Sequence, residues 1–181
     1  MNIYKELYKI TANDDLRPSF RGVYHDKGKL VAINGHVLAI VSHKYDPSLE
    51  GCIMSKCGEK IDASFLKYEK LELPQPNATL SSRLFKCAEN LRGVKGASIL
   101  IDLDWSLSVK YVLMIKDLMY LLNEYPDIIY HSDLNKGVMF KSHSVEALVM
   151  PMFDRGKNIY TYEEAEAYVK PSKTKNWYER Q

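Results

Sequence analysis

Apolar residues recur along this chain at two spacings, one typical of helices and one typical of short strands. In residues 2–12, Ile3, Leu7 and Ile10 recur at helical spacing. After that segment, short apolar runs alternate with turn residues, and the Asn34-Gly35 pair is a strong signal for a tight turn. The first part of the chain therefore predicts a helix at 2–12 and strands at 19–25, 30–33 and 37–41.

The second half of the chain repeats this order of elements. Ser108 is a suitable N-cap for an apolar helix, which Pro126 ends. The predicted elements are a helix at 109–123 and strands at 128–131, 138–141 and 145–150. A helix followed by three strands, found twice, predicts an α+β fold in which helices pack on antiparallel sheets.

The middle and the end of the chain complete the expected organisation. A hairpin at 52–61, a helix at 82–91 and a strand at 99–103 are predicted between the two repeats, and the proline-rich residues 74–78 form a candidate internal boundary. After Phe153 the chain becomes charged, with one helix expected at 162–170. We therefore expect one domain at 1–153 and a tail at 154–181 whose aromatic residues dock in an apolar groove of the same chain or of a neighbouring copy.

Composition narrows the classes of function. The 181 residues carry a net charge of +2 without a basic run, so a DNA-binding tail is not expected. The three cysteines are irregularly spaced and favour a reducing compartment, and the chain has neither a signal-peptide core nor a membrane span. The expected location is the cytoplasm.

Catalytic and metal-binding signals are weak. The chain has no phosphate-binding glycine loop, no serine nucleophile elbow and no zinc-protease motif. His25, His43, His131 and His143 lack ligand spacing and are interpreted as surface or turn residues. Asp102 and Asp104 leave a metal-dependent enzyme as an alternative. The main expectation is a protein that is not an enzyme, with no cofactor and no metal.

Two apolar strings carry a resemblance to a known family. Residues 32–39 read Ala-Ile-Asn-Gly-His-Val-Leu-Ala and follow an Arg17-Pro18 pair and a hairpin, and residues 147–153 read Ala-Leu-Val-Met-Pro-Met-Phe. They resemble the Ala-Thr-Asp-Gly-His-Arg-Leu-Ala and Val-Val-Met-Pro-Met-Arg strings of the bacterial DNA sliding clamp, the beta subunit of DNA polymerase III. Residues 61–68 are similar to a further clamp segment. The chain is too short for the three domains of a clamp.

The resemblance implies a DNA-clamp-like fold with a pocket for partner peptides. An extended peptide with apolar anchors would suit such a groove, although alternating apolar strand residues are more often plain core. Val37 and Phe153 replace clamp arginines, so the pocket would be more apolar than usual. The expected pocket residues are Phe20, Ile33, Gly35, His36, Val37, Leu38, Pro74, Leu148, Met150, Pro151 and Met152.

The resemblance also implies a surface for double-stranded DNA, because clamp helices face the duplex. Sequence-independent phosphate contacts would come from cations on the three helices, unless these are ordinary solvated charges. The candidate residues are Lys5, Lys9, Arg83, Lys86, Arg92, Lys110 and Lys116. The expected function is a clamp-like protein of DNA replication or repair that binds partner peptides and DNA, with a homo-oligomer left open. An accessory or mobile-element protein that mimics or blocks the clamp without holding DNA is the alternative.

Overall fold

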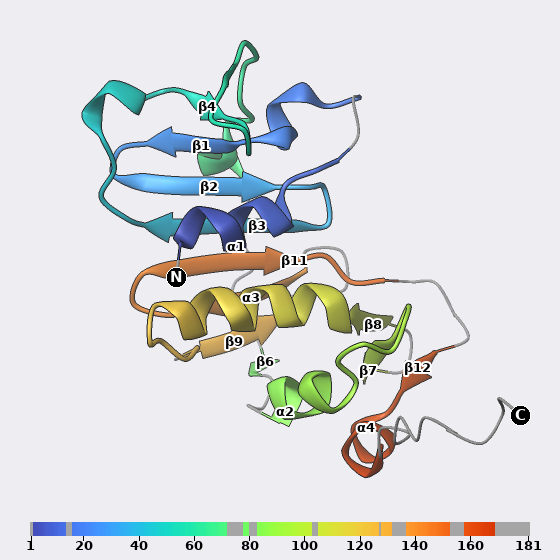
Figure 1. Ribbon diagram of the computed structural model, residues 1–181. Helices are drawn as coiled ribbons and strands as arrows, with labels where there is room; N and C mark the ends of the chain where they lie inside the picture. Colours follow the sequence, from blue (N-terminus) through green and yellow to red (C-terminus); the bar gives the residue numbers. More distant parts are fainter. Residues whose placement is uncertain are drawn as a thin grey trace, which may run out of the picture.

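The computed structural model describes residues 2–13, 16–71, 78–79, 83–102, 105–126, 128–131, 137–152 and 158–168 (Figure 1). Of these, residues 78–79, 102 and 128–131 are described by their backbone alone.

The first repeat begins with helix α1, Ile3–Ile10. The side chain of Asn2 caps this helix by accepting a hydrogen bond from the Tyr4 backbone N–H at 2.9 Å. The helical spacing of Ile3, Leu7 and Ile10 places all three side chains on one buried face. The predicted helix is confirmed, and it ends two residues earlier than expected.

Three antiparallel strands follow α1, as the sequence predicts. They are β1 (Val23–Asp26), β2 (Lys29–Ile33) and β3 (Val37–Ser42). Lys27 and Gly28 both have positive φ angles, which is typical of a two-residue hairpin turn between twisted strands. The strand predicted at 19–25 is shorter than expected, because Pro18 starts a single 3-10 turn, η1 (Pro18–Arg21), before β1 begins.

The second repeat has the same order of elements. It consists of α3 (Val109–Leu121), β9 (Ile128–His131), β10 (Val138–Lys141) and β11 (Val145–Val149). Ser108 is the N-cap residue of α3, but its side chain makes no capping hydrogen bond. The predicted repeat of a helix and three strands is therefore confirmed.

The two repeats join edge to edge in one sheet. Within the described residues, nine strands follow the order β5-β4-β1-β2-β3-β11-β10-β9-β6, and every neighbouring pair is antiparallel. β3 pairs with β11 in the centre, with Val37 opposite Val149 and Leu38 opposite Leu148. The outer strands are β4 (Ile53–Met54), β5 (Lys60–Ile61) and β6 (Ala78–Thr79). The α+β fold with helices on antiparallel sheets is thus confirmed.

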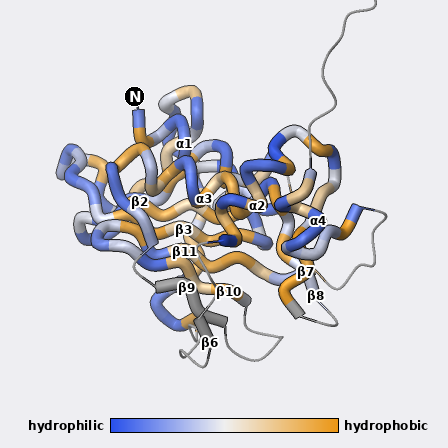
Figure 2. The backbone as a smooth tube through the Cα atoms, turned by 90° about the horizontal axis from the view of Figure 1, so that it is seen from below, coloured by the Kyte–Doolittle hydropathy of each residue, from blue (hydrophilic) through white to orange (hydrophobic). Residues whose placement is uncertain are grey.

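The two faces of the main sheet carry separate apolar clusters, because alternate strand residues point to opposite sides. The helix-covered face holds the main core, in which Val37, Ala39 and Val41 pack with residues of α1, α2 and α3. Figure 2 shows apolar segments along the inner strands and α3. The other face holds a smaller cluster around Ile33 and Leu38. No helix in the described part of the chain is long and apolar enough to span a bilayer.

A second, three-stranded sheet lies beside the main one (Figure 1). It pairs β7 with β8 in antiparallel orientation and β7 with β12 in parallel orientation. The elements here are α2 (Arg83–Asn90), β7 (Ser98–Asp102), β8 (Trp105–Ser108), β12 (Ile159–Tyr160) and α4 (Tyr162–Ala167). β8 and β12 are additional to the predicted strands.

The described part of the tail docks on α2 and β7, away from the pocket where its aromatic residues were expected. Ala165 is fully buried, and the Asn90 side chain donates a hydrogen bond to the Ala165 carbonyl at 3.1 Å. Tyr160, Tyr162 and Tyr168 pack against the main core. Trp177 and Tyr178, the other expected anchors, lie outside the described residues.

His25 is fully buried, so the prediction of a surface or turn residue at this position is wrong. Its ring lies 3.0 Å from the Tyr4 hydroxyl and 3.1 Å from the Cys52 carbonyl oxygen. These two partners satisfy both ring nitrogens of a neutral imidazole. Burial lowers the pKa of His25, which favours the neutral form at the junction of α1 and β1.

Candidate functional site

The centre of the main sheet brings the two apolar strings of the sequence into contact. Leu38 on β3 lies directly opposite Leu148 on β11. Both side chains belong to the smaller apolar cluster, together with Ile33 and Phe20. Ile33 and Leu38 are buried, whereas Phe20 and Leu148 are half-buried. The side that faces away from the helices therefore has an apolar floor with partly accessible walls.

The Asn34-Gly35 turn closes one end of this cluster. The Asn34 side chain accepts hydrogen bonds from the backbone N–H groups of His36 and Val37, each at 2.9 Å. Gly35 has a φ of 92°, and a Cβ there would lie 2.5 Å from a guanidinium nitrogen of Arg17. The positive φ favours glycine at this position, whereas the Arg17 guanidinium is the end of a flexible side chain and could move aside. The turn places the Arg17 guanidinium beside the cluster, 5.2 Å from the centre of the Phe20 ring.

The second string, residues 147–153, begins in β11 beside β3 and continues beyond the end of that strand. The Met150 backbone N–H donates a hydrogen bond to the His36 carbonyl at 2.8 Å, and the exposed His36 ring stacks on Tyr111. The side chains of Leu148 and Met150 share one face, since both lie within 3.3 Å of the place where a Cβ on Gly137 would stand. Pro151 is half-buried after the end of β11.

Met152 was expected beside these residues, and its backbone pairs with a different strand. It forms an isolated bridge with Ser106 of β8, with backbone hydrogen bonds of 2.8 and 3.1 Å in the two directions. Val37 packs in the main core on the opposite face of the sheet, because it is one residue before Leu38 in the same strand. Pro74 lies outside the described residues.

A segment that the sequence reasoning did not assign to the site covers part of the cluster. Tyr68 is buried in it, and Phe65 and Leu71 pack at its edge. The Phe65 ring stacks on Tyr24 with 4.5 Å between the ring centroids. The Tyr68 hydroxyl donates a hydrogen bond of 2.7 Å to the buried carboxylate of Asp26. Two signals existed in the sequence: the clamp-like segment 61–68, and the strand alternation that puts Val31 and Ile40 on this face.

On the helix side, five of the seven expected DNA-facing cations are paired with carboxylates. Lys9 pairs with Glu6 of the same helix, and Lys116 pairs with Glu89 of α2. Arg92 donates to both Glu89 and Asp117. The hydrogen bonds from Arg92 and Lys116 lower the pKa of Glu89 to about 2. Lys5 is exposed, and the ammonium of Lys110 lies 5.5 Å from the centre of the Tyr111 ring.

The remaining two paired cations lie on α2 and face the acidic helix α4. Arg83 donates hydrogen bonds of 2.9 and 2.7 Å to the two carboxylate oxygens of Glu166, and one of 3.1 Å to Glu163. The bonds from Arg83 to Glu166 lower the pKa of Glu166 below its ordinary value. Lys86 lies 4.0 Å from Glu166. The cationic side of α2 is therefore covered by carboxylates of the same chain.

The described side chains form no group of three His, Cys, Asp or Glu residues that could hold a metal ion. Asp104 lies outside the described residues, and Asp102 is described by its backbone alone, as the last residue of β7. The structure therefore describes no side chain of the metal-dependent enzyme site that Asp102 and Asp104 would form.

No protein-family model matches the chain, and no curated protein matches it in sequence. Solved structures of bacterial sliding clamps do match. The beta sliding clamp of Caulobacter crescentus has a TM-score of 0.61 at 13% identity, over 83% of this chain and 62% of that chain. A ligand-bound clamp of Pseudomonas aeruginosa has a TM-score of 0.57 at 15% identity, over 83% and 64%.

A griselimycin-bound DnaN clamp of Bartonella birtlesii has a TM-score of 0.57 at 14% identity, over 82% of this chain and 63% of that chain. The chain thus spans less than two thirds of the length of these clamps. Identities this low carry information on the fold alone. Over most of its length, the chain has the fold of the bacterial DNA polymerase III beta sliding clamps.

Proposed function

We propose that this chain is a non-catalytic, clamp-like protein of DNA replication or repair that binds extended peptides of partner proteins. The observation that carries the proposal is the contact between the two clamp-like strings, in which Leu38 lies opposite Leu148. A shared fold alone says little about function, whereas this site has a specific chemistry. Its residues come from the strings that resemble the clamp pocket.

The chemistry of the cluster suits an apolar peptide anchor. Ile33 and Leu38 form a buried floor, and Phe20, Leu148 and Met150 stand half-buried around it. A methionine at the rim can adapt to anchors of different shape, because its unbranched side chain has three rotatable bonds. An extended peptide would gain affinity by burying one or two apolar side chains there.

Replacement of Leu148 by alanine tests this site. We expect the affinity for a clamp-binding peptide to fall about fivefold or more, because the variant loses part of an apolar wall. Titration calorimetry with the parent, Leu148→Ala and Tyr120→Ala measures the effect. Tyr120 is 62% exposed on α3, on the helix side of the sheet, and serves as the control truncation. A parent protein that binds no such peptide at millimolar concentration would contradict the proposal.

A second candidate is an accessory protein that occupies clamp partners without holding DNA. The ion pairs on the helices favour it, because phosphates would have to compete with carboxylates for Lys9, Arg83, Lys86, Arg92 and Lys116. Exposed pairs of this kind contribute little to stability, about 0–1 kcal/mol each. Their main effect here would be electrostatic, because the carboxylates reduce the positive potential that attracts the phosphates of duplex DNA.

Binding to duplex DNA separates the two candidates, because a clamp-like protein of the first kind would also hold DNA and one of the second kind would not. For the second candidate, we expect weak binding by the parent, and tighter binding when Glu163→Gln and Glu166→Gln are combined to release Arg83 and Lys86. The slope of log affinity against log salt should steepen by roughly 0.9 for each released cation. Fluorescence anisotropy at several salt concentrations measures both quantities.

The control for this experiment is a variant with the same change of net charge elsewhere. Glu59 and Asp62 are both exposed and neither forms an ion pair in the described part of the chain, so Glu59→Gln combined with Asp62→Asn is suitable. Tight, strongly salt-dependent binding by the parent, unchanged in the Glu163 and Glu166 variant, would exclude the second candidate and favour the first.

A further inference from the structure

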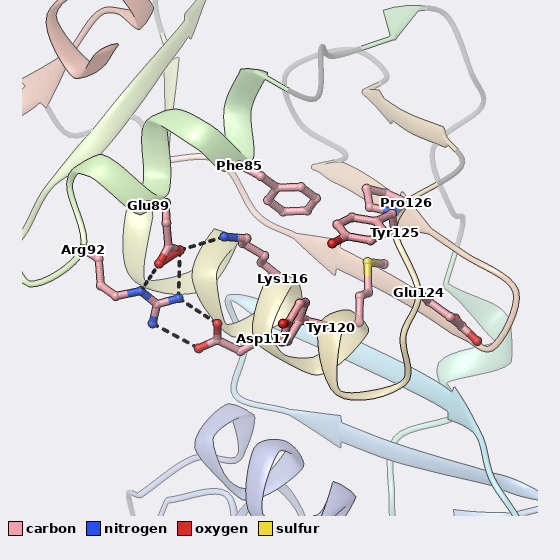
Figure 3. Close-up of a pocket in the computed structure, with 10 residues that line it drawn as sticks. Phe85, Glu89, Arg92, Lys116, Asp117, Tyr120, Glu124, Tyr125 and Pro126 are labelled. Atoms are coloured by element: carbon pink, nitrogen blue, oxygen red, sulfur yellow. Dashed lines mark hydrogen bonds and ion pairs between the residues drawn. The ribbon is translucent and has the colours of Figure 1, made fainter. Parts of the chain in front are cut away.

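A cavity of about 410 Å³ lies between α2, α3 and the residues that follow α3 (Figure 3). Phe85 and Arg92 belong to the α2 side, Lys116 and Tyr120 to α3, and Tyr125 to the segment after it. Volumes of 300–1,000 Å³ are typical of small-molecule sites. The cavity is on the helix side of the main sheet and is separate from the apolar cluster around Leu38.

Aromatic side chains form the accessible walls of this cavity. Tyr120 and Tyr125 are 62% and 68% exposed, although most large apolar side chains of the described chain are buried. Figure 3 shows Phe85, Tyr125 and Pro126 on one side of the pocket and Tyr120 on the other. Exposed aromatic rings around a cavity indicate a ligand with a flat π face.

The polar end of the cavity is electrically balanced and rich in donors. The Arg92 guanidinium is engaged by two carboxylates, with hydrogen bonds to Glu89 of 2.6 and 3.0 Å and to Asp117 of 2.7 and 3.1 Å. Lys116 Nζ makes one hydrogen bond within the described part of the chain, to Glu89 at 2.9 Å. An ammonium group has three protons, so Lys116 can also donate to a ligand.

Glu124 is the remaining carboxylate that lines the cavity, and it would not repel a ligand that accepts a hydrogen bond from Lys116. Glu124 points away from the aromatic walls in Figure 3. It accepts hydrogen bonds from the Ser142 hydroxyl at 2.6 Å and from the Ser144 backbone N–H at 2.9 Å. The groups left for a ligand are therefore two tyrosine hydroxyls and the Lys116 ammonium.

We propose that this cavity binds a planar heteroaromatic ring, such as a nucleobase, stacked on Tyr120 or Tyr125 with an in-plane acceptor on Lys116. The ring of a phenylalanine side chain would fill the space but would offer no acceptor to the ammonium. A phosphate group would gain little, because Glu89 and Asp117 already neutralise Lys116 and Arg92. Recognition of the base rather than the phosphate makes affinity only weakly dependent on salt.

Such a ring could come from a free nucleotide or from a single-stranded nucleic acid. Calorimetric titrations of the full chain with AMP, with a ten-residue oligoadenylate and with ribose 5-phosphate distinguish these sources. Equal affinity per base for AMP and the oligonucleotide assigns the site to free nucleotides, and clearly tighter binding of the oligonucleotide assigns it to single strands. Either result supports the proposal.

Variants locate the binding. We expect Tyr125→Ala to lower affinity about fivefold or more, as for the loss of one base–aromatic stack. Lys116→Met, which retains the aliphatic stem, should also weaken binding. Leu16→Ala is the control, since Leu16 is 90% exposed and outside the cavity. The variant Leu148→Ala should bind the base as the parent does, so failure of the peptide site and failure of this one are distinguishable.

Three results would overturn the assignment. They are binding of ribose 5-phosphate as tight as that of AMP, affinity unchanged in both Tyr125→Ala and Lys116→Met, and no binding of either nucleotide ligand by the parent at millimolar concentration. A steep loss of affinity with added salt would likewise point to phosphate contacts elsewhere on the chain.

Discussion

Replacement of Phe140 by alanine is expected to lower the free energy of unfolding by about 3–5 kcal/mol, the range for truncating a buried phenylalanine. Phe140 lies on β10 and is fully buried. Its ring is 5.7 Å from that of Phe85 on α2, so the substitution leaves a cavity between the sheet and the helices. The loss should appear in urea denaturation followed by circular dichroism.

A second probe tests whether the two repeats share one core. Trp105 belongs to the same buried cluster as Phe140 and as Leu7 of α1, so in a Trp177→Phe background its fluorescence should change at the same urea concentration as the helical signal. Tyr120→Ala is the control, because Tyr120 is 62% exposed, and its effect should stay within about 0.5 kcal/mol. A loss below 1 kcal/mol for Phe140→Ala would contradict its place in a packed core, and two separate transitions would show that the repeats do not form one cooperative unit.

Removal of the Tyr68 hydroxyl is expected to cost about 1.5–3 kcal/mol, the range for a hydrogen bond to a charged group. Tyr68 and Asp26 are 5% and 7% exposed, and the hydroxyl donates to the carboxylate at 2.7 Å. Tyr68→Phe therefore leaves a buried carboxylate oxygen without this donor. Burial and the bond to Asp26 also raise the pKa of Tyr68, so the hydroxyl remains a donor throughout the neutral range.

The same variant should loosen the segment that covers the proposed peptide site. Since Tyr68 anchors residues 65–71 to β1, we expect faster amide hydrogen exchange in that segment, measured by mass spectrometry. Tyr45→Phe is the matched control, because Tyr45 also donates to a carboxylate, that of Glu50, but in an exposed pair. Equal effects of Tyr68→Phe and Tyr45→Phe would refute a special role for the buried bond.

The order of elements could be predicted because it depends on local signals. Helical spacing of Ile3, Leu7 and Ile10, the Asn34-Gly35 turn and Pro126 each act within a few residues, and α1, β3 and the end of α3 follow them closely. Strand β8 was missed because Trp105–Ser108 is short and runs directly into α3. Short strands depend on their partners, here β7, for their hydrogen bonds.

The candidate site could be predicted only in part. The strings around Leu38 and Leu148 were found from the resemblance, and the pairing of β3 with β11 brings them together. Val37 was placed with them although strand alternation puts it on the opposite face. Tyr68 was missed because its role depends on Asp26, a residue 42 positions away.

The sequence by itself determined the two repeats, the turns and the apolar character of the strings, because each depends on neighbouring residues and on the period of the pattern. Only the tertiary structure decided which charges are available. The cations Arg83, Arg92 and Lys116 meet carboxylates from other helices, and α4 covers α2 rather than the apolar cluster. Such pairings arise from packing between distant segments, which the order of residues does not reveal.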